Sequence, residues 1–251
     1  MPGEKITAMI SVAGFGENEY LTMVTRQGVI KRTLLSEYEY QRKGGKIALN
    51  LDEGDELVFV MHSMGDKDVL LATHEGSAAR FSESQVRPLS RTARGVRGVK
   101  LREGDFVVGA VIVDDSKQLI TVTENGYGKR TPFDDFRVKG RGGLGVTCHN
   151  LTDKTGLLAG IAAVTDDDDL MMITNTGTII RTPVAQINTY SRTAAGVIVM
   201  RLGEGQTLVG FSKVAHEEEE QTASTDDTEA VPVAGAPEAV SAEPLSDTDG
   251  E

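Results

Sequence analysis

Apolar and polar residues alternate along four stretches of the chain, and a turn signal interrupts each stretch. In the clearest one, residues 119–131 (LITVTENGYGKRT), the alternation runs into Asn125-Gly126 and resumes after it. An Asn-Gly pair suits a two-residue type I′ turn, because both central residues of that turn need a positive φ. The pattern therefore predicts a β-hairpin.

The hairpin pattern recurs at a regular interval. Its turn glycines are Gly28, Gly76, Gly126 and Gly177, which are separated by 48, 50 and 51 residues. A threonine lies three positions before each of them, at Thr25, Thr73, Thr123 and Thr174. An arginine lies four positions after each of them, at Arg32, Arg80, Arg130 and Arg181. In a β-rich chain a period of this length predicts propeller-like blades.

Two further elements complete each unit. A strand that follows a glycine near acidic or polar residues, as in EGDELVFVM at Gly54, closes the unit. Before it lies a basic, glycine-rich loop that leads into a strand. The four loops align on Gly45, Gly95, Gly145 and Gly196, with Gln41, Arg91, Arg141 and Arg192 four positions earlier. Glycine there permits close backbone approach and leaves room for a phosphate.

These patterns predict an all-β array of about four four-stranded blades over residues 1–214, with units of roughly 13–63, 64–114, 115–165 and 166–214. Residues 1–12 repeat the closing-strand pattern, so we expect a closing strand ahead of the first unit. It either completes the final blade or is left from a unit of a longer protein. Residues 215–251 combine low hydrophobicity with charge of one sign, which predicts a disordered acidic tail.

The formal net charge of −12 is unevenly distributed along the chain. Twelve of the 38 acidic residues lie in 215–251, which holds no Lys or Arg, so residues 1–214 carry 26 acidic and 26 basic side chains. Within this neutral part the bases are clustered. A positive surface is therefore compatible with zero net charge.

The sequence contains no catalytic or metal-binding motif that we recognise. Cys148 is the single cysteine, and the four histidines, His62, His74, His149 and His216, are scattered. Cys148 and His149 are neighbours in a predicted strand, where successive side chains point to opposite faces, so a nucleophile–base pair is not expected. The chain also lacks a long apolar run and an N-terminal signal segment. We expect a soluble cytoplasmic protein with no membrane partner, no metal and no catalytic residue.

The recurring bases predict a DNA-binding rim. Duplex DNA is a uniform polyanion, and phosphate contacts by Arg and Lys give sequence-independent affinity. Aromatic residues make up only 5% of the chain, which disfavours stacking on single strands. The candidate DNA contacts are Lys31, Arg32, Gln41, Arg42, Lys43, Lys46, Arg80, Arg91, Arg94, Arg97, Lys129, Arg130, Lys139, Arg141, Arg181 and Arg192. For Arg32, Arg80, Arg130 and Arg181 an equally supported alternative is a structural pairing with a carbonyl or an acid of the next blade.

At these motifs the sequence resembles the C-terminal domain of the DNA gyrase A subunit. The resemblance covers 1–214 and the acidic tail, and it is most specific at NGYGKRT and MMITNTGTIIRTPV. It implies a β-pinwheel of six blades with shared strands, around which DNA is wrapped in a positive sense. Residues 41–46 (QRKGGK) are similar to the gyrase box QRRGGKG, but Ile47 stands where the box ends in glycine. The resemblance then suggests blades three to six, with the true box in an N-terminal part that this chain lacks.

The resemblance also implies partners and limits. The nucleophilic tyrosine of the family follows an arginine, and none of Tyr20, Tyr38, Tyr40, Tyr127 or Tyr190 does. The chain is therefore expected to hold no catalytic part and no cofactor, while ATP and Mg²⁺ would be used elsewhere in the holoenzyme. The implied partners are double-stranded DNA, the rest of the gyrase A polypeptide and the gyrase B polypeptide, in an A2B2 heterotetramer. The alternatives are the similar domain of topoisomerase IV and a kelch-like protein-interaction propeller; an enzyme built on a propeller is a weaker one.

The first testable prediction concerns residues 215–251. A flexible chain of this length explores distances of about 30 Å, by the estimate of 5–6 Å times the square root of the residue number. Its twelve acidic residues can then compete with DNA for the basic rim. Deletion of 215–251 should tighten duplex binding, with a gain that shrinks as salt screens both interactions. Equal affinities of the full and shortened chains in a low-salt titration would contradict it.

Overall fold

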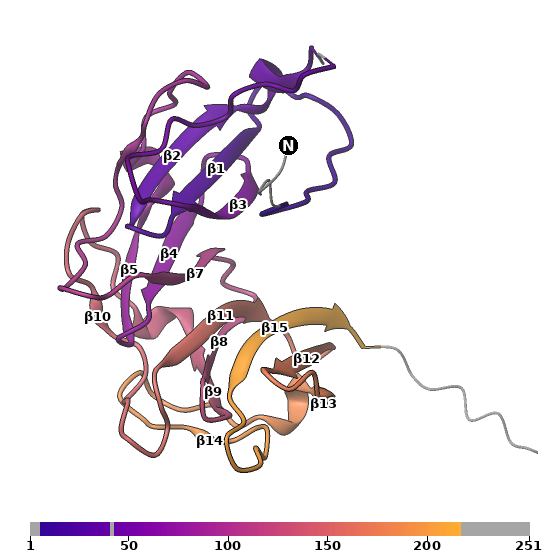
Figure 1. Cartoon of the computed structure of the whole chain (residues 1–251). Helices are drawn as coiled ribbons and strands as arrows, with labels where there is room; N and C mark the ends of the chain where they lie inside the picture. The colour runs from indigo at the N-terminus through magenta and orange to yellow at the C-terminus, as the bar shows by residue number, and fades with distance from the viewer. Residues whose placement is uncertain (1–5, 41–42, 217–251) are drawn as a thin grey trace, which may run out of the picture. The chain divides into compact units, whose positions relative to one another are not determined.

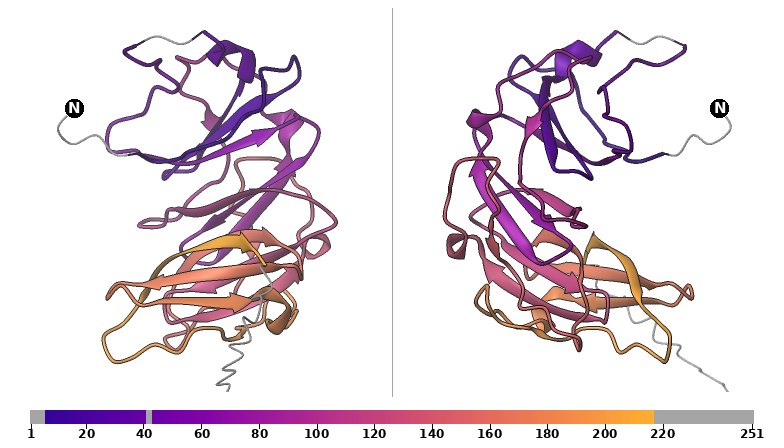
Figure 2. Two further views of the ribbon diagram at one scale, coloured as in Figure 1. Left: turned by 90° about the vertical axis from the view of Figure 1, so that its right-hand side faces the viewer. Right: turned by 60° about the vertical axis from the view of Figure 1, so that its left-hand side comes forward.

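The structure, a computed structural model, describes residues 6–40 and 43–216. They belong to one compact unit, Met1–His216. In this part of the chain four small antiparallel sheets succeed one another in sequence order, from the indigo strands to the orange ones (Figure 1, Figure 2). The all-β, propeller-like repeat fold is confirmed. None of the helices in 6–40 and 43–216 is long and apolar enough to span a membrane.

Each unit consists of a hairpin, a short 3-10 helix and a closing strand. The hairpins are β1 Tyr20–Thr25 with β2 Val29–Leu34, β4 Asp68–Thr73 with β5 Ser77–Ser82, β8 Gln118–Thr123 with β9 Tyr127–Pro132, and β12 Asp168–Thr174 with β13 Ile179–Pro183. The helices are η1 Leu35–Tyr38, η2 Glu83–Gln85, η3 Phe133–Asp135 and η4 Val184–Gln186. The closing strands are β3 Leu57–Ser63, β7 Val107–Ile112, β11 Leu158–Val164 and β15 Leu208–Ala215, and each pairs with the first hairpin strand of its own unit.

The hairpin turns explain the recurring threonine. In the third unit the Thr123 carbonyl accepts a hydrogen bond from Gly126 N–H (3.0 Å), and its hydroxyl accepts one from Tyr127 N–H (3.2 Å). The loop is therefore the three residues Glu124–Gly126, with Gly126 at φ 76°. The predicted two-residue type I′ turn is wrong, because a type I-like turn followed by a left-handed glycine closes the same hairpin.

The outer edge of each of the first three sheets is supplied by the next unit. The three edge strands, two residues each, are β6 Val96–Arg97 on β2, β10 Val146–Thr147 on β5, and β14 Val197–Ile198 on β9. All three come from the predicted glycine-rich loops. Among the described residues the fourth sheet has only three strands, in the order β13-β12-β15.

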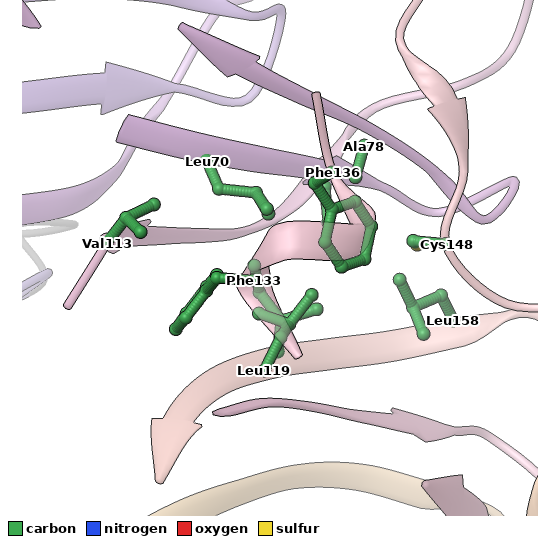
Figure 3. Packing of buried hydrophobic residues seen from close by; sticks show 10 residues of the cluster. Leu70, Ala78, Val113, Leu119, Phe133, Phe136, Cys148 and Leu158 are labelled. Atoms are coloured by element: carbon green, nitrogen blue, oxygen red, sulfur yellow. The ribbon is translucent and has the colours of Figure 1, made fainter. Parts of the chain in front are cut away.

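Three apolar cores lie between successive sheets. Each combines side chains from the hairpin of one unit with side chains from the hairpin, helix and loop of the next. Figure 3 shows the core between the second and third sheets, where Leu70 and Ala78 lie on one side and Leu119 and Leu158 on the other, with Phe136 between them. All five side chains are at most 1% exposed.

The expected closing strand over 1–12 is wrong for residues 6–12, which form no strand and are exposed except at Ile10. A closing strand pairs with the first hairpin strand of its own unit, and no such hairpin precedes residues 6–12 in this chain. Residues 1–5 lie outside the described part.

The other end of the repeat array also differs from the prediction. Strand β15 continues to Ala215, which pairs with Asp168. His216 then follows, with Nδ1 at 2.9 Å from Asp169 Oδ1. The folded part therefore extends two residues into the predicted tail, and residues 217–251 lie outside the described part.

Candidate nucleic-acid interface

The predicted basic loops lie at the outer edges of the sheets, and we call them rim loops. They comprise residues 41–47, 90–97, 140–147 and 191–198, of which the first is described from Lys43. Rim loops two to four each end in an edge strand that pairs with the preceding hairpin. At Gly145 (φ 77°) an added Cβ would lie 2.5 Å from the Ala78 carbonyl oxygen. Glycine is thus needed at this crossing for close packing, not only for ligand access.

An arginine at the start of each later rim loop ties it to the loop before it. Arg141 Nη1 donates to the Arg97 carbonyl (3.0 Å), and Arg192 Nη1 donates to the Thr147 carbonyl (2.7 Å). Arg91 Nη1 makes the same bond to Ile47 (3.1 Å) in the first rim loop. A guanidinium has five N–H donors, so such an arginine can hold the loops together and still present donors to a phosphate.

Two of the predicted DNA contacts, Lys31 and Lys129, are fully buried. Lys129 Nζ donates to the Ser191 and Arg192 carbonyls of the fourth rim loop, at 2.6 Å each. Burial lowers the pKa of Lys129 to about 8. Lys31 Nζ likewise donates to the Ala48 carbonyl (2.7 Å) and to the Arg91 carbonyl of the second rim loop, and burial lowers its pKa to about 8. The structure contradicts direct phosphate contacts by both lysines, because their ammonium groups face backbone carbonyls inside the fold.

The buried lysines match the sequence of the loop that they hold. Lys31 and Lys129 lie under the loops SRTARG (90–95) and SRTAAG (191–196), while the corresponding Ala79 lies under GRGGLG (140–145). Both SRT loops contain the same turn, in which an alanine N–H bonds to the serine carbonyl at 3.1 Å. The chain thus has lysine-braced rim loops and glycine-rich ones. A lysine three positions after a turn glycine, followed by SRTxxG in the next unit, is the sequence signal for this brace.

His149 adds a second brace to the fourth rim loop. Its Nε2 lies 3.0 Å from the Ala195 carbonyl, and its Nδ1 lies 2.9 Å from Thr121 Oγ1. Burial lowers the pKa of His149 to about 4 and raises the pKa of Cys148 to about 12. A neutral, fully hydrogen-bonded imidazole next to a buried thiol is structural, since a nucleophilic cysteine needs an accessible thiolate.

The hairpin arginines also have structural partners. Arg80 pairs with Asp68 of its own hairpin (2.8 Å) and donates to the Phe133 carbonyl of the next unit (2.8 Å). Arg32 Nη1 donates to the Gly65 carbonyl (3.2 Å), and its side chain is almost fully buried.

The two later hairpins follow the same scheme. Arg130 bonds to the Ile187 carbonyl and to the Asp166 carboxylate, both from the next unit. Arg181 pairs with Asp169 at 2.6 Å. Arg32, Arg80 and Arg130 therefore fit the structural alternative of a carbonyl or an acid of the next unit, whereas Arg181 pairs with an acid of its own hairpin.

The remaining candidates that the structure describes lie at the rim. Lys43, Arg97 and Lys139 are exposed, and among the described residues their side chains have no hydrogen bond or ion pair. Arg94 is exposed but pairs with Asp52 (2.7 Å). Lys46 Nζ donates to the Glu37 carbonyl at 3.1 Å. The candidates Gln41 and Arg42 lie outside the described residues.

The structure also contains a basic groove that the repeat pattern does not predict. It encloses about 720 Å³ between the first hairpin turn and the second unit, and its cationic lining is Arg26, Arg97, Lys100 and Arg102. The guanidinium of Arg26 stacks over the Phe106 ring at 3.7 Å. Of these four bases only Arg97, which lies in the rim loop 90–97, was a candidate; Arg26 lies in the first hairpin turn, and Lys100 and Arg102 follow the rim loop. Their clustering around one turn depends on the packing between units.

Comparisons with known proteins place this geometry in a family. The family described as "DNA gyrase C-terminal domain, beta-propeller" matches residues 19–63, 67–114, 117–165 and 168–215. The DNA gyrase A subunit of Staphylococcus epidermidis strain ATCC 12228 is 45% identical over 86% of this chain and 24% of its own length. The same protein of Staphylococcus aureus strain MRSA252 is 43% identical over 90% of this chain and 26% of its own. The chain thus spans about a quarter of these relatives.

Solved structures give the same result. The C-terminal domain of a DNA topoisomerase IV is similar with a TM-score of 0.77 and 28% identity, over 82% of this chain and 65% of that chain. A DNA gyrase A C-terminal domain is similar with a TM-score of 0.73 and 29% identity, over 80% of this chain and 68% of that chain.

The second testable prediction concerns the lysine brace. Replacement of Lys129 by Met should lower the free energy of unfolding by about 1–3 kcal/mol, because buried carbonyls lose their donor. Hydrogen exchange at Ala194 N–H should accelerate. Urea unfolding measures the change in the free energy of unfolding. The control is Lys67→Met, which removes the same charge from an exposed position. A surface change of this kind should stay within about 0.5 kcal/mol of the native chain.

The same variants test the lowered pKa of Lys129. Since its pKa is about 8 when folded and 10.5 for the free side chain, the unfolded chain binds more protons between these values. The free energy of unfolding should therefore rise with pH through this window. The rise should be smaller in Lys129→Met than in Lys67→Met, and identical pH profiles would contradict the assignment.

Proposed function

The chain belongs to the family of DNA gyrase C-terminal beta-propeller domains, and from this membership we propose that it binds duplex DNA without sequence preference and bends or wraps it. The observation that carries the proposal is the set of exposed bases on or directly before successive rim loops, Lys43, Arg97 and Lys139, whose side chains have no partner among the described residues. They lie on the first three units. A duplex that follows the rim would meet one basic loop after another.

The contacts expected of such a surface are to phosphates. Exposed Lys and Arg side chains neutralise phosphates and release counterions, which gives affinity that is independent of base sequence. The arginines that tie the rim loops together hold these bases at a fixed spacing, so the free energy of DNA bending is offset by several simultaneous contacts. The basic groove at Arg26 and Lys100 extends this surface toward the hairpin turns.

The family relatives are about four times as long as this chain. We propose that it acts as the C-terminal part of the gyrase A polypeptide, with the rest of that polypeptide and the gyrase B polypeptide in an A2B2 assembly that supercoils DNA with ATP. No tyrosine of this chain follows an arginine, as the catalytic one of the family does. Strand cleavage and ATP hydrolysis would belong to the other parts of the assembly.

The corresponding domain of topoisomerase IV is the second candidate, supported by the likeness of the fold. The 43–45% identity to gyrase A polypeptides and the loop QRKGGK at 41–46 favour gyrase. A relaxation and supercoiling assay of the enzyme that carries this domain would distinguish the two, since wrapping in a positive sense is expected of gyrase alone.

The third testable prediction is a steep salt dependence. Affinity for duplexes of unrelated sequence should be nearly equal, and log K should fall by about 0.9 per log unit of salt for each phosphate neutralised. A titration of labelled duplexes of increasing length, at several salt concentrations, measures both the slope and the footprint. Tight binding that is insensitive to salt would contradict the proposal.

The fourth testable prediction separates rim contacts from general charge. The double variant Arg97→Ala/Lys139→Ala removes two exposed bases without known partners, so the salt slope should become shallower by about 1.8 while the fold stays intact. The control is Lys67→Ala/Lys117→Ala, which removes the same charge from equivalent positions nine residues before a turn glycine. Equal losses of affinity in both variants would assign binding to net charge and not to the rim.

A further inference from the structure

The boundary between the first and second units contains a buried polar cluster. Glu83, the first residue of η2, is 0% exposed, and its Oε1 accepts hydrogen bonds from Thr22 Oγ1 (2.9 Å) and from Ser63 Oγ. Thr22 is also 0% exposed, and Ser63 is 5% exposed. Thr22 lies in β1 and Ser63 in β3, so a carboxyl group of the second unit meets two hydroxyl groups of the first. We call these three residues the polar triad.

The same three positions are apolar at the other two boundaries. The positions correspond by their distance from the turn glycine and by the strand pairing. At the second boundary they hold Leu70, Val113 and Phe133, which belong to the core of Figure 3. At the third boundary they hold Ile120, Val164 and Val184, all 0% exposed. The polar triad therefore replaces a complete apolar contact and not a single side chain.

The first boundary also leaves buried charged groups incompletely paired. Glu83 Oε2 is buried, and it has no hydrogen-bond partner within 6–40 and 43–216. Arg32 Nε is likewise buried without a partner in this part of the chain, whereas the Nε of its counterpart Arg80 pairs with Asp68 at 2.8 Å. In the first hairpin Tyr20 stands at the position of Asp68 and offers Arg32 its ring, at 4.5 Å, in place of a carboxylate.

These differences make the first boundary easier to open. An unpaired buried donor or acceptor has lost its hydration and has gained no hydrogen bond in exchange. When the boundary opens, water hydrates Glu83 and Arg32, which offsets part of the cost of opening. An apolar boundary has no such compensation, because opening it only exposes Leu, Val, Ile or Phe side chains to water.

We propose that the boundary between the first and second units is a hinge, and that the polar triad is what makes it one. The first unit separates there from the second by local opening, while the second, third and fourth units stay packed together. One consequence rests on the proposed function. The hinge lets the rim adjust its curvature to a bound duplex without disrupting the apolar cores between the later units.

Three equivalent backbone hydrogen bonds report on the three boundaries. They run from Leu89 N–H to the Arg32 carbonyl (2.8 Å), from Lys139 N–H to the Arg80 carbonyl (2.9 Å) and from Tyr190 N–H to the Arg130 carbonyl (2.8 Å). Native-state hydrogen exchange of the full chain, without DNA, measures their protection factors. The protection factor of Leu89 should be at least about tenfold below the other two, since one unpaired buried group accounts for a factor of this order.

A triple variant tests whether the polar triad is the cause. Thr22→Leu/Ser63→Val/Glu83→Phe gives the first boundary the side chains of the second, and it should raise the protection of Leu89 at least about tenfold. Protection at Lys139 and Tyr190 should not change, which is the internal control. Replacement of buried polar groups by apolar ones of fitting shape is often neutral or stabilising, so this variant is expected to fold.

The reciprocal variant moves the hinge. Leu70→Thr/Val113→Ser/Phe133→Glu gives the second boundary the polar triad, and it should lower the protection of Lys139 while Tyr190 keeps its own. Circular dichroism establishes that both variants are folded. If the reciprocal variant does not fold, the first variant decides the question alone.

Equal protection of the three amides in the native chain would overturn the proposal, because the first boundary would then open no more readily than the others. An apolar first boundary that left the protection of Leu89 unchanged, or lowered it, would overturn it as well, since the polar triad would not be the cause of opening. The exchange experiment contains no DNA. Failure to bind duplexes in the salt titration would therefore remove the proposed function without deciding whether the hinge exists.

Discussion

The structure depends on one constraint, which is that a sheet edge needs a partner for its backbone groups. Each of the first three hairpins obtains that partner from the next unit, as a strand of only two residues. So short a strand is held mainly by what surrounds it. The close crossing at Gly145, the arginine bonds between successive rim loops and the apolar cores between the sheets all serve this exchange. Successive units are therefore joined by the continuous chain, by a shared sheet and by a shared apolar core, all at the boundary between the two units.

This constraint changes how the recurring bases are understood. The arginine that repeats in every hairpin has a backbone carbonyl or a carboxylate as partner within the fold in every unit. Arg80 and Arg130 each donate to a carbonyl of the following unit, and Lys129, which recurs only as Lys31, is fully buried. Arg97 and Lys139, which are exposed and have no partner within 6–40 and 43–216, occupy positions where the units differ. Strict periodicity of a charge is thus evidence for a structural contact at least as much as for a polyanionic ligand.

The features that the sequence predicted correctly are those that depend on neighbouring residues in the chain. Alternation, turn glycines and the 48–51-residue spacing are enough to locate the hairpins, the glycine-rich loops and the all-β repeat. What it could not predict depends on distant segments. The sheet that a two-residue strand joins, the burial of Lys129 under Ser191 and the clustering of Arg26 with Lys100 arise only when units pack. The closing strand expected over 1–12 is wrong for residues 6–12 for the same reason, because a strand pattern without a partner does not make a strand.

The two kinds of rim loop, lysine-braced and glycine-rich, would contribute differently to the binding of a ligand. A loop braced by a buried ammonium group is fixed before any ligand arrives, so its arginines lose little conformational entropy on binding. The loop GRGGLG has no buried lysine beneath it and is held by Arg141 bonds to the Gln85 and Arg97 carbonyls. Gly140 has nothing within 4 Å of an added Cβ, so packing alone does not explain its glycine. Open glycine instead allows a phosphate backbone to approach closely and allows the loop to adjust to it. The second and fourth units carry the braced loops, and the third carries the glycine-rich one between them. A duplex that bent along the rim would then meet two loops held by buried lysines, separated by one that is held by arginine bonds and has an open glycine for close approach.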